Sequence, residues 1–479
     1  MADPRAEGGA HQRPDVAEDA PLLVDVHACI AIGEPTRHGP EGSARDPARP
    51  PWPSSSAHQG SWSGAGEDGR PEGPAVSWPG ARAHRPHRAP RARPAPGRGR
   101  PRRHGLRGGA ALDVLEQERA RFRPVVLVAA TQGDALLAAA RRVGAPRIVL
   151  ADPVAGAAWA ERMGPGDPEL AFGPEAVQAA AEAPDVDVVV QGITGAAGLE
   201  ASLAAARSGK RIALANKESL VVAGPLLVRA AREGGATLLP VDSEHAALHQ
   251  ALRAGRPDEV RRLVLTASGG PFRGKRREDL LHVTPAEALA HPTWTMGPRI
   301  TVDSATLMNK ALEVIEARWL FDVEPERIEV VVHPQSIVHS LVEFVDGSVV
   351  AQMGPPDMRL PVRYALGWPD RLEAAAPRFD AADYARLTFE PPDTETFPAL
   401  GLGFEAARRG GTAGAALNAA DETAVARFLA GELAFLDITR VVADVLARHP
   451  FVAEPDLADL RAVDAWARTE TALACEAVS

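Results

Sequence analysis

Residues 291–316 contain the highest density of chemically distinct polar side chains in the sequence. This stretch reads HPTWTMGPRITVDSATLMNKALEVIE. Apolar residues recur at helical spacing over the second half of this stretch, which predicts a helix. On that helix Asn309 lies four residues and Lys310 three residues before Glu313, so an amide, an ammonium and a carboxylate share one face. Such a face is typical of a binding site, and also of a solvated helix surface with one ion pair.

The scarcity of lysine and asparagine favours the binding site. The chain has 53 Lys and Arg together, yet the only lysines are Lys210, Lys217, Lys275 and Lys310. Because Arg serves at almost every other basic position, a Lys indicates a position that needs a compact ammonium on a flexible stem. Two of the four lysines directly follow one of the three asparagines, in ANKES and MNKAL.

Candidate phosphate ligands surround the same helix. A turn is predicted before it, because Asp303, Ser304 and Thr306 are N-capping residue types. Hydroxyl and amide donors combined with cations suit a phosphate, and such a set is formed by Ser268, His291, Ser304, Asn309 and Lys310. Trp294 and Met296 lie in a loop bounded by Gly and Pro, which predicts either an apolar lid or a loop anchored in the core by its tryptophan.

Composition narrows the class of protein. A length of 479 residues with 45% hydrophobic residues predicts two or three soluble globular domains. The formal charge of −10 argues against nucleic acid as a general partner. Two cysteines, Cys29 and Cys475, provide neither a disulfide framework nor a metal finger, which predicts a reducing, cytoplasmic compartment. No apolar run approaches the roughly 20 residues that span a bilayer, so no membrane partner is expected.

Residues 1–108 differ from the rest of the chain. They are crowded with Pro, Gly, Arg and His, show little periodicity, and contain no acidic residue between Gly73 and Leu112. Three interpretations compete: a disordered basic arm, an organelle transit peptide, and a segment translated out of frame. Early acidic residues such as Asp3 and Glu7 oppose a transit peptide. Back-translation of residues 97–108 with GC-rich codons, read one nucleotide later, permits VAVALGATGSVG, a strand followed by a glycine-rich dinucleotide turn.

An α/β region is predicted from residue 109 to residue 239. Buried strands such as RPVVLVAAT and DVDVVVQGI alternate with helices of suitable length, which predicts a doubly wound parallel sheet. Such sheets bind ligands at the carboxyl ends of their strands. The glycine-rich sequence at 191–198 and the sequence Asn-Lys-Glu-Ser at 216–219 both fall at such ends.

A second α/β unit is predicted over residues 240–370. Asp242, Ser243 and Glu244 follow a strand and begin a helix, so the two acids suit either a metal site or the positive end of a helix. Together with Glu313 they would form a set of three carboxylates, which favours Mg²⁺ or Mn²⁺ because no Cys or His is among the ligands. His245 and His249 are expected to be core or surface residues, and three later strands are expected to form a meander.

Two further segments complete the predicted organisation. Prolines accumulate through residues 371–398, which predicts a linker. Residues 399–479 have helical patterning and predict a small helical bundle.

Seven motifs in order resemble the 1-deoxy-D-xylulose 5-phosphate reductoisomerase family. The motifs are ANKESLV at 215–221, PVDSEH at 240–245, SGGPF at 268–272, HPTWTMG at 291–297, VDSATLMNKALEVIEA at 302–317, VHPQSIVHS at 332–340 and ALNAADE at 416–422. The resemblance runs from about Ala110 to the C-terminus.

The resemblance implies an NADPH-binding domain, a catalytic domain that carries homodimer contacts, and a helical C-terminal domain. It implies conversion of 1-deoxy-D-xylulose 5-phosphate to 2-C-methyl-D-erythritol 4-phosphate in the non-mevalonate route to isoprenoids. The implied metal ligands are Asp242, Glu244 and Glu313. The implied substrate contacts are Lys217, Ser243, Glu244, Ser268, His291, Ser304, Asn309, Lys310 and Glu313, with Trp294 and Met296 on a mobile loop. The implied catalytic residues are Lys217, Glu244, His291 and Glu313, and the implied cofactor contacts are Asn216, Glu218 and Gly297.

One departure from the family concerns the dinucleotide site. The first strand and its Gly-rich phosphate turn should lie just before Ala111, where this chain has PRRHGLRGG. Without that turn the pyrophosphate would lose its helix N-terminus and backbone donors. An alternative is therefore a protein that binds metal and sugar phosphate without turnover. A different nicotinamide dehydrogenase is opposed by the combination of Asp-Ser-Glu with Asn-Lys-x-x-Glu.

Overall fold

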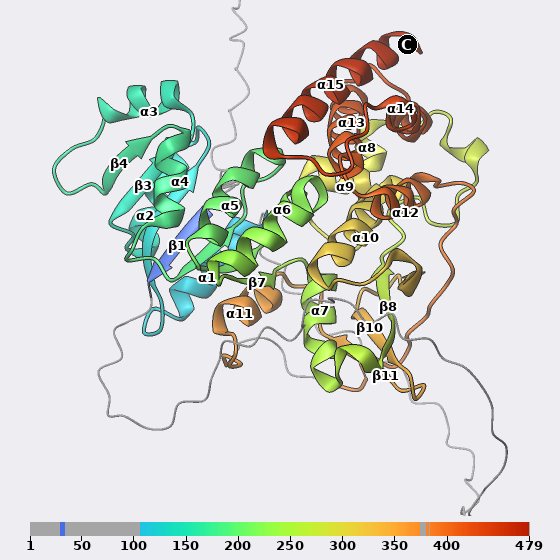
Figure 1. The fold of residues 1–479 in the computed structure, drawn as a ribbon, viewed down its shortest axis with the longest axis horizontal. Helices are drawn as coiled ribbons and strands as arrows, with labels where there is room; N and C mark the ends of the chain where they lie inside the picture. Colours follow the sequence, from blue (N-terminus) through green and yellow to red (C-terminus); the bar gives the residue numbers. More distant parts are fainter. Residues whose placement is uncertain (1–28, 34–105, 374–379, 383, 479) are drawn as a thin grey trace, which may run out of the picture. The chain divides into compact units, whose positions relative to one another are not determined.

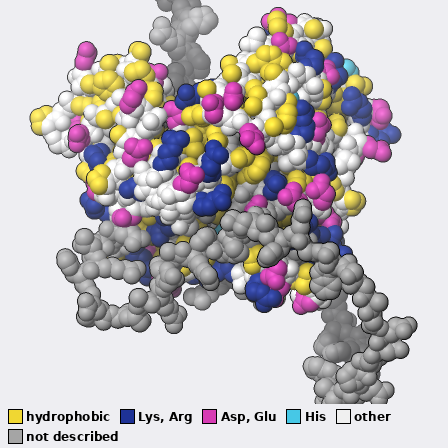
Figure 2. Space-filling view, in the orientation of Figure 1, with side chains coloured by type: hydrophobic (Ala, Val, Ile, Leu, Met, Phe, Trp, Pro, Cys, Tyr) yellow, Lys and Arg dark blue, Asp and Glu magenta, His cyan; other side chains and the backbone are white. Residues whose placement is uncertain are grey.

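The computed structural model describes residues 29–33, 106–373, 380–382 and 384–478. All of these described residues belong to one unit (Figure 1). Within the described residues no helix is both long and apolar enough to cross a membrane. On the face shown in Figure 2, Lys and Arg side chains are interspersed with Asp and Glu side chains, so this face has no continuous basic surface of the kind that binds a nucleic-acid backbone.

The predicted doubly wound sheet is present and has seven strands in the order β4-β3-β2-β1-β5-β6-β7. Its strands after the first are β2 (Arg123–Ala129), β3 (Arg147–Leu150), β4 (Glu169–Phe172), β5 (Val188–Gln191), β6 (Arg211–Leu214) and β7 (Thr237–Pro240). The apolar runs of β2, β3, β5 and β6 are buried, as expected for strands covered on both faces, whereas the edge strand β4 is largely exposed. The connecting helices are α2 (Gly133–Val143), α3 (Pro153–Ala160), α4 (Pro174–Glu182), α5 (Leu199–Arg207) and α6 (Glu218–Gly234).

Strand β1 (Cys29–Gly33) differs from the sequence prediction, which assigned no element to residues 1–108. It lies between β2 and β5 and is antiparallel to both, with Cys29 opposite Val128 on β2 and Gln191 on β5. Ile30 and Ile32 are fully buried. A short apolar run thus fills the central position of the sheet, where it pairs its backbone on both sides. The other predictions for residues 1–28 and 34–105 fall outside the described residues.

The direction of β1 affects the edge of the sheet at which a dinucleotide would bind. This edge is formed by the carboxyl ends of the parallel strands. Because Cys29 lies opposite the last residue of β5, the chain enters the sheet at the carboxyl ends of the parallel strands. A parallel strand would leave the sheet at that edge and continue through a turn into helix α1 (Leu106–Gln117). The β1 strand therefore does not provide the Gly-rich turn of the family.

A second sheet has four strands in the order β11-β10-β8-β9, formed by β8 (Val260–Ala267), β9 (Ile328–Val332), β10 (Val338–Phe344) and β11 (Val349–Met353). The predicted meander over the last three strands was wrong in one respect. Strand β10 pairs with β11 in an antiparallel hairpin, but β9 pairs in parallel with β8. Strand β8, the longest of the four, lies between β9 and β10 and pairs along both of its edges.

Helices surround this second sheet and link it to the first. They are α7 (Ser243–Ala251), α8 (Pro285–Ala288), α9 (Pro298–Thr306), α10 (Met308–Leu320) and α11 (Arg359–Gly367). Short 3-10 helices lie at Ala196–Gly198, Leu252–Ala254, Pro257–Glu259, Arg277–Leu280 and Pro325–Arg327.

The prediction of a turn at residues 303–306 was wrong, because these residues belong to helix α9. The chain breaks one residue later, at Leu307, whose φ of 65° lies in the left-handed region. The hydroxyl of Thr306 accepts a hydrogen bond from the backbone N–H of Met308 at 3.3 Å, so it caps the following helix. Of the three residues of capping type, only Thr306 contacts the start of α10, whose N-cap position is Leu307.

The C-terminal residues form the predicted helical bundle, with α12 (Ala399–Arg409), α13 (Ala413–Leu429), α14 (Phe435–Arg448) and α15 (Leu457–Glu476). Helix α13 is its central element and packs against α15 and α14 within the bundle and against α6 and α9 outside it (Figure 1). Small residues such as Gly414 permit this approach, because a Cβ there would come within 2.0 Å of the Val221 carbonyl oxygen.

We predict that Ile32→Asp destabilises the protein by about 4 kcal/mol, because the carboxylate would be buried without a partner. The free energy of unfolding would be measured in urea. The control Val154→Asp places the same side chain at a position that is 78% exposed and should change stability by less than about 0.5 kcal/mol. Equal unfolding curves for the two variants would mean that residues 29–33 are not part of the sheet.

Candidate metal and sugar-phosphate site

Three carboxylates from two helices meet where the two sheets join. Asp242 directly precedes helix α7 and caps it, accepting a hydrogen bond from the Ser243 N–H at 3.0 Å. Glu244 lies in the first turn of the same helix, and Glu313 lies on α10. One oxygen from each carboxylate lies within 4.8 Å of the others, so these residues could hold a metal ion. The structure thus brings together the three metal ligands predicted from sequence.

Two buried lysines hold these carboxylates together. Lys217, at the start of α6, has its Nζ 2.9 Å from Asp242 Oδ2 and 3.3 Å from Glu313 Oε1. Lys310 has its Nζ 2.9 Å from Glu244 Oε1 and forms a shorter ion pair with Glu313. Both ammonium groups are only 3% exposed, so they compensate charge that solvent cannot.

The protonation equilibria reflect this arrangement. Burial raises the pKa of Glu313, and the nearby Glu244 carboxylate raises it further. Burial alone would raise the pKa of Glu244, but attraction to Lys310 outweighs it and lowers that pKa. Burial opposes the charge of Lys310 too, yet Glu244 and Glu313 raise its pKa. Fully ionised, the three carboxylates and two ammonium groups carry a net charge of −1, which a divalent cation would reverse to +1.

Asn309 connects Lys217 to Glu313 within this cluster. Its Oδ1 accepts a hydrogen bond from Lys217 Nζ at 2.6 Å, and its Nδ2 donates to Glu313 Oε1 at 2.6 Å. The spacing of Asn309, Lys310 and Glu313 therefore does place all three side chains in one site. The solvated-face interpretation was wrong for these residues, since Lys310 and Glu313 are buried.

Ser268 and His291 form the next part of the site. The Ser268 hydroxyl lies 2.9 Å from His291 Nε2, and His291 Nδ1 accepts hydrogen bonds from the N–H groups of Thr293 and Trp294. Since Nδ1 accepts, the proton of the neutral ring is on Nε2 and is donated to Ser268. Burial lowers the pKa of His291 to about 4, so this side chain provides a neutral polar group at pH 7.

Ser304 lies on helix α9, whose backbone approaches the turn that follows Ser268. The close approach is made at Gly270, where a Cβ would come within 2.5 Å of the Ser304 carbonyl oxygen. Gly270 also has a φ of 67°, and its N–H donates to the Ser268 hydroxyl at 3.2 Å. The Ser-Gly-Gly turn and the backbone of α9 can therefore pack closely, although Ser268 and Ser304 are 36 residues apart in sequence.

The loop of residues 291–297 carries the two predicted lid residues. Trp294 and Met296 are both half-buried, and the Trp294 ring centroid lies 6.3 Å from that of His339. Gly297 ends the loop and caps helix α9. The role of Trp294 and Met296 as a lid stays a prediction.

Two of the three predicted cofactor residues, Asn216 and Glu218, follow the carboxyl end of β6, whereas Gly297 precedes helix α9. The Asn216 side-chain amide donates to the carbonyl oxygens of Ile193 and Gly195 and to Glu218 Oε2, at 2.6, 3.0 and 2.9 Å. Asn216 is 1% exposed and so fixes both the glycine loop and Glu218. The carboxyl end of β6 therefore fits a contact with a cofactor. At the neighbouring position of the sheet, antiparallel β1 takes the place of the strand that would supply a phosphate turn.

Two functional candidates were missed by sequence reasoning or only partly identified. His245 is a core histidine, as expected, yet Asp242, His245 and Glu316 form a second group of ligand atoms within 4.8 Å of one another. Burial raises the pKa of Glu316 to about 7. Arg299 gathers four carboxylates around it, and it had no sequence signal because arginine is so abundant in this chain.

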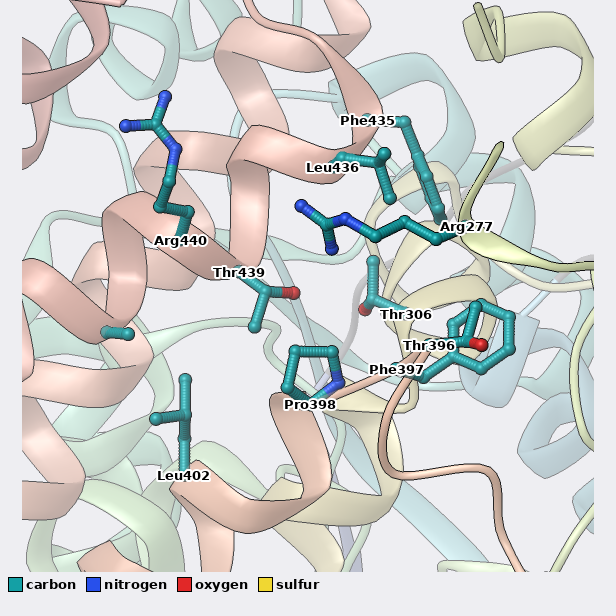
Figure 3. Close-up of a pocket in the computed structure, with 11 residues that line it drawn as sticks. Arg277, Thr306, Thr396, Phe397, Pro398, Leu402, Phe435, Leu436, Thr439 and Arg440 are labelled. Atoms are coloured by element: carbon teal, nitrogen blue, oxygen red, sulfur yellow. The ribbon is translucent and has the colours of Figure 1, made fainter. Parts of the chain in front are cut away.

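A separate cavity of about 190 Å³ lies between α12, α14 and the segment around Arg277 (Figure 3). Its lining residues are Arg277, Thr306, Thr396, Phe397, Pro398, Leu402, Phe435, Leu436, Thr439, Arg440 and Ala443. None of the predicted site residues is among them, although Thr306 ends the helix that carries Ser304.

Fold and site together define a class of protein: an α/β protein with a dinucleotide-type sheet and a buried carboxylate and lysine centre suited to a divalent ion and a phosphorylated substrate. The chain belongs to the 1-deoxy-D-xylulose 5-phosphate reductoisomerase family. The family model described as 1-deoxy-D-xylulose 5-phosphate reductoisomerase matches residues 105–224, and that of its C-terminal domain matches residues 238–321. A third model, the DXP reductoisomerase C-terminal domain, matches residues 353–470.

Individual relatives agree with the family models. The 1-deoxy-D-xylulose 5-phosphate reductoisomerase of Symbiobacterium thermophilum is 52% identical over 368 residues, which cover 76% of this chain and 95% of the relative. That of Ralstonia nicotianae is 49% identical over 369 residues, with 76% and 94% covered.

Solved structures agree as well. The enzyme from Zymomonas mobilis in complex with NADPH is 45% identical, covers 77% of this chain and 96% of its own, and has a TM-score of 0.72. A reductoisomerase in complex with NADPH, fosmidomycin and magnesium is 38% identical, covers 78% and 97%, and has a TM-score of 0.75.

We predict that millimolar Mg²⁺ raises the melting temperature by about 3 °C, the shift expected for a chain of this length when a ligand that binds only the folded state is about 100-fold above its Kd. Glu313→Gln should lose most of that shift, because it removes a charged ligand of the group formed with Asp242 and Glu244. Differential scanning calorimetry with and without Mg²⁺ measures it.

Glu316→Gln is the matched control, since Glu316 lies on the same helix and is equally buried. It should keep the Mg²⁺ shift. The reverse pattern would assign the ion to the group of Asp242, His245 and Glu316.

Proposed function

We propose that this protein converts 1-deoxy-D-xylulose 5-phosphate to 2-C-methyl-D-erythritol 4-phosphate, using NADPH and a divalent metal ion, as a step of non-mevalonate isoprenoid biosynthesis. The observation that carries the proposal is the buried cluster in which Lys217 and Lys310 hold three carboxylates together. Family membership supports it, because relatives at about 50% identity bear the name of this enzyme. Related structures contain NADPH and magnesium.

Asp242, Glu244 and Glu313 would hold the metal ion, either Mg²⁺ or Mn²⁺. Bound there, a divalent ion supplies a Lewis acid for the substrate oxygens. The donor set fits such an ion because it contains only carboxylate oxygens. Ser243 supports the arrangement, since its hydroxyl donates to Glu244 Oε2 at 2.5 Å.

We propose that Lys217 and Lys310 exchange their carboxylate partners for the substrate when a metal ion binds. Each ammonium has three donors, and both are fully used within the protein. Lys217 engages Asn309, Asp242 and Glu313, and Lys310 engages Glu244, Glu313 and the Thr266 carbonyl oxygen. When the carboxylates ligate an ion instead, these donors become free to bind an anionic substrate in the same place.

The phosphate of the substrate is proposed to bind among Ser268, His291, Ser304, Asn309 and Lys310. Of these, only Lys310 brings a positive charge, since His291 is neutral at pH 7. The hydroxyl and amide groups therefore provide directional hydrogen bonds, and Lys310 provides the charge. Trp294 and Met296 would close over the substrate and exclude water.

Asn216, Glu218 and Gly297 are proposed to contact NADPH, which supplies the hydride for the reduction. The alternative of a binding protein without turnover is not favoured, because the metal and lysine cluster is complete and the relatives are named as enzymes.

The predicted organisation accompanies this function as a proposal. Residues 109–239 would form the cofactor domain, residues 240–370 the catalytic domain with homodimer contacts, residues 371–398 a linker and residues 399–479 the helical domain. The small-molecule substrate is a sugar phosphate, and a cytoplasmic location is expected from the low cysteine content.

We predict that Glu244→Gln lowers metal-dependent NADPH oxidation with 1-deoxy-D-xylulose 5-phosphate by about 100-fold or more, since even groups behind a metal ligand cost 10- to 100-fold when removed. The decrease in absorbance of NADPH measures it. Glu454→Gln, at an exposed position far along the chain, should retain the activity. Retained activity in the Glu244 variant would exclude this carboxylate from the ligand set.

We also predict that a chain with VAVALGATGSVG in place of residues 97–108 binds NADPH at least about tenfold more tightly than the unaltered chain. The inserted strand and turn would replace β1 between β2 and β5 and supply backbone donors to the pyrophosphate. Isothermal titration measures the Kd. A control chain in which the three inserted glycines are alanines should not gain affinity, because the turn could not form. No gain in either chain would mean that this chain binds the cofactor phosphates by other groups.

A further inference from the structure

Arg299 is the most heavily contacted cation outside the metal site among the described residues. It is the second residue of α9 and directly follows the loop that ends at Gly297. Its side chain is 22% exposed. Four carboxylates lie within 3.7 Å of its guanidinium nitrogens: Glu218 at 3.2 Å, Asp421 at 3.4 Å, Glu422 at 3.5 Å and Asp303 at 3.7 Å.

These partners come from three helices that are far apart in sequence. Glu218 begins α6, Asp303 lies on α9, and the other two carboxylates lie on α13 in the sequence ALNAADE. Arg299 also donates a hydrogen bond to Asn418 Oδ1 on α13 at 2.7 Å. The planar guanidinium has five N–H donors in a fixed arrangement, so one side chain can serve all three helices at once.

Burial makes the cluster dependent on this cation. Asp303 and Asp421 both lie against the Arg299 guanidinium and are at most 3% exposed. Burial raises the pKa of Asp303 well above its usual range, and the neighbouring Asp421 raises it further. Burial would lower the pKa of Arg299, but the surrounding carboxylates outweigh this and raise it. Arg299 is therefore the permanent charge around which the acidic side chains assemble.

One branch of the cluster reaches the cofactor edge. Glu218 is held at both carboxylate oxygens, since Oε1 faces Arg299 and Oε2 accepts a hydrogen bond from Asn216. Glu422 is a second link, because a Cβ on Gly195 would come within 3.0 Å of its Oε1. Arg299 thus fixes the orientation of Glu218. Its other partner Glu422 borders the glycine loop that follows β5.

We propose that Arg299 is a positioning residue for NADPH, which holds the Glu218 carboxylate in the orientation that meets the cofactor. This inference rests on the proposed function, in which Glu218 contacts NADPH. Arg299 itself acts through Glu218 and does not touch the reacting atoms. The same role accounts for the buried polar residues of helix α13, because they contact the guanidinium that orients Glu218.

The test is a comparison of Arg299→Met and Arg299→Lys with the unaltered protein in steady-state kinetics. Methionine keeps an unbranched apolar stem and removes the charge, so the KM for NADPH should rise about tenfold while the KM for the sugar phosphate stays within twofold. Lysine keeps the charge but reaches fewer partners at once, so its NADPH KM should rise only about threefold. A merely structural role would lower the amount of active enzyme without this selective change in KM.

Arg468→Met is the matched control. Arg468 donates to Glu422 at 2.6 Å and to Asp464, and no contact joins it to Glu218 among the described residues. Its NADPH KM should stay within twofold of the unaltered protein. An equal rise in the two methionine variants, or none in Arg299→Met, would overturn the inference. If Arg299→Met does not fold, the lysine variant decides alone, and an unchanged NADPH KM there overturns it.

A different experimental result would disprove the proposed function. If the unaltered protein does not oxidise NADPH with the sugar phosphate, that function fails. Direct titration of the proteins with NADPH, followed by its fluorescence, then tests Arg299 separately: about tenfold weaker binding by Arg299→Met than by Arg468→Met supports the inference, and equal binding overturns it.

Discussion

The structure depends on the compensation of three buried carboxylates by two buried lysines. Acidic groups this close repel one another strongly in a medium of low dielectric constant, and cations must therefore accompany them. Lys217 arrives from the start of α6, whereas Lys310 and Glu313 arrive from α10, and Asp242 and Glu244 from the start of α7. The same ion pairs thus connect the first sheet to the second unit and create a place for a divalent ion. The charges of the site are thus largely compensated within the protein, because each ammonium contacts two of the carboxylates.

A second buried cluster uses arginine for a different purpose. Lys217 and Lys310 are compact charges whose contacts can be exchanged, which suits a site that must accept an ion and a substrate. Arg299 has a rigid, planar group, which suits a permanent junction of α6, α9 and α13. The Arg299 junction joins helices that are distant in sequence. It also gives the C-terminal helices a part in the site, although none of the residues predicted to bind metal, substrate or cofactor lies on them.

Strand β1 shows how a sheet can be completed by a segment that does not carry the expected function. The position between β2 and β5 requires an apolar run that pairs its backbone on both sides, and Cys29–Gly33 satisfies that requirement in the antiparallel direction. Hydrophobic burial has no direction, whereas a phosphate turn requires the chain to leave the sheet at its carboxyl edge and enter a helix. Packing of the core can therefore be intact while the dinucleotide edge departs from the family pattern.

The sequence by itself determined the elements, their approximate order and the chemistry of the metal and phosphate residues, because helical spacing, buried apolar runs and rare lysines are local signals. It placed Asn309, Lys310 and Glu313 on one helix face, and the resemblance to a family supplied their partners. The tertiary structure decided what local signals cannot contain. It moved the helix break to Leu307, set β9 beside β8, brought Cys29–Gly33 into the sheet and gathered four carboxylates around Arg299. These features follow from burial and pairing between segments distant in sequence, and the free energy of such contacts exists only once the chain has brought them together.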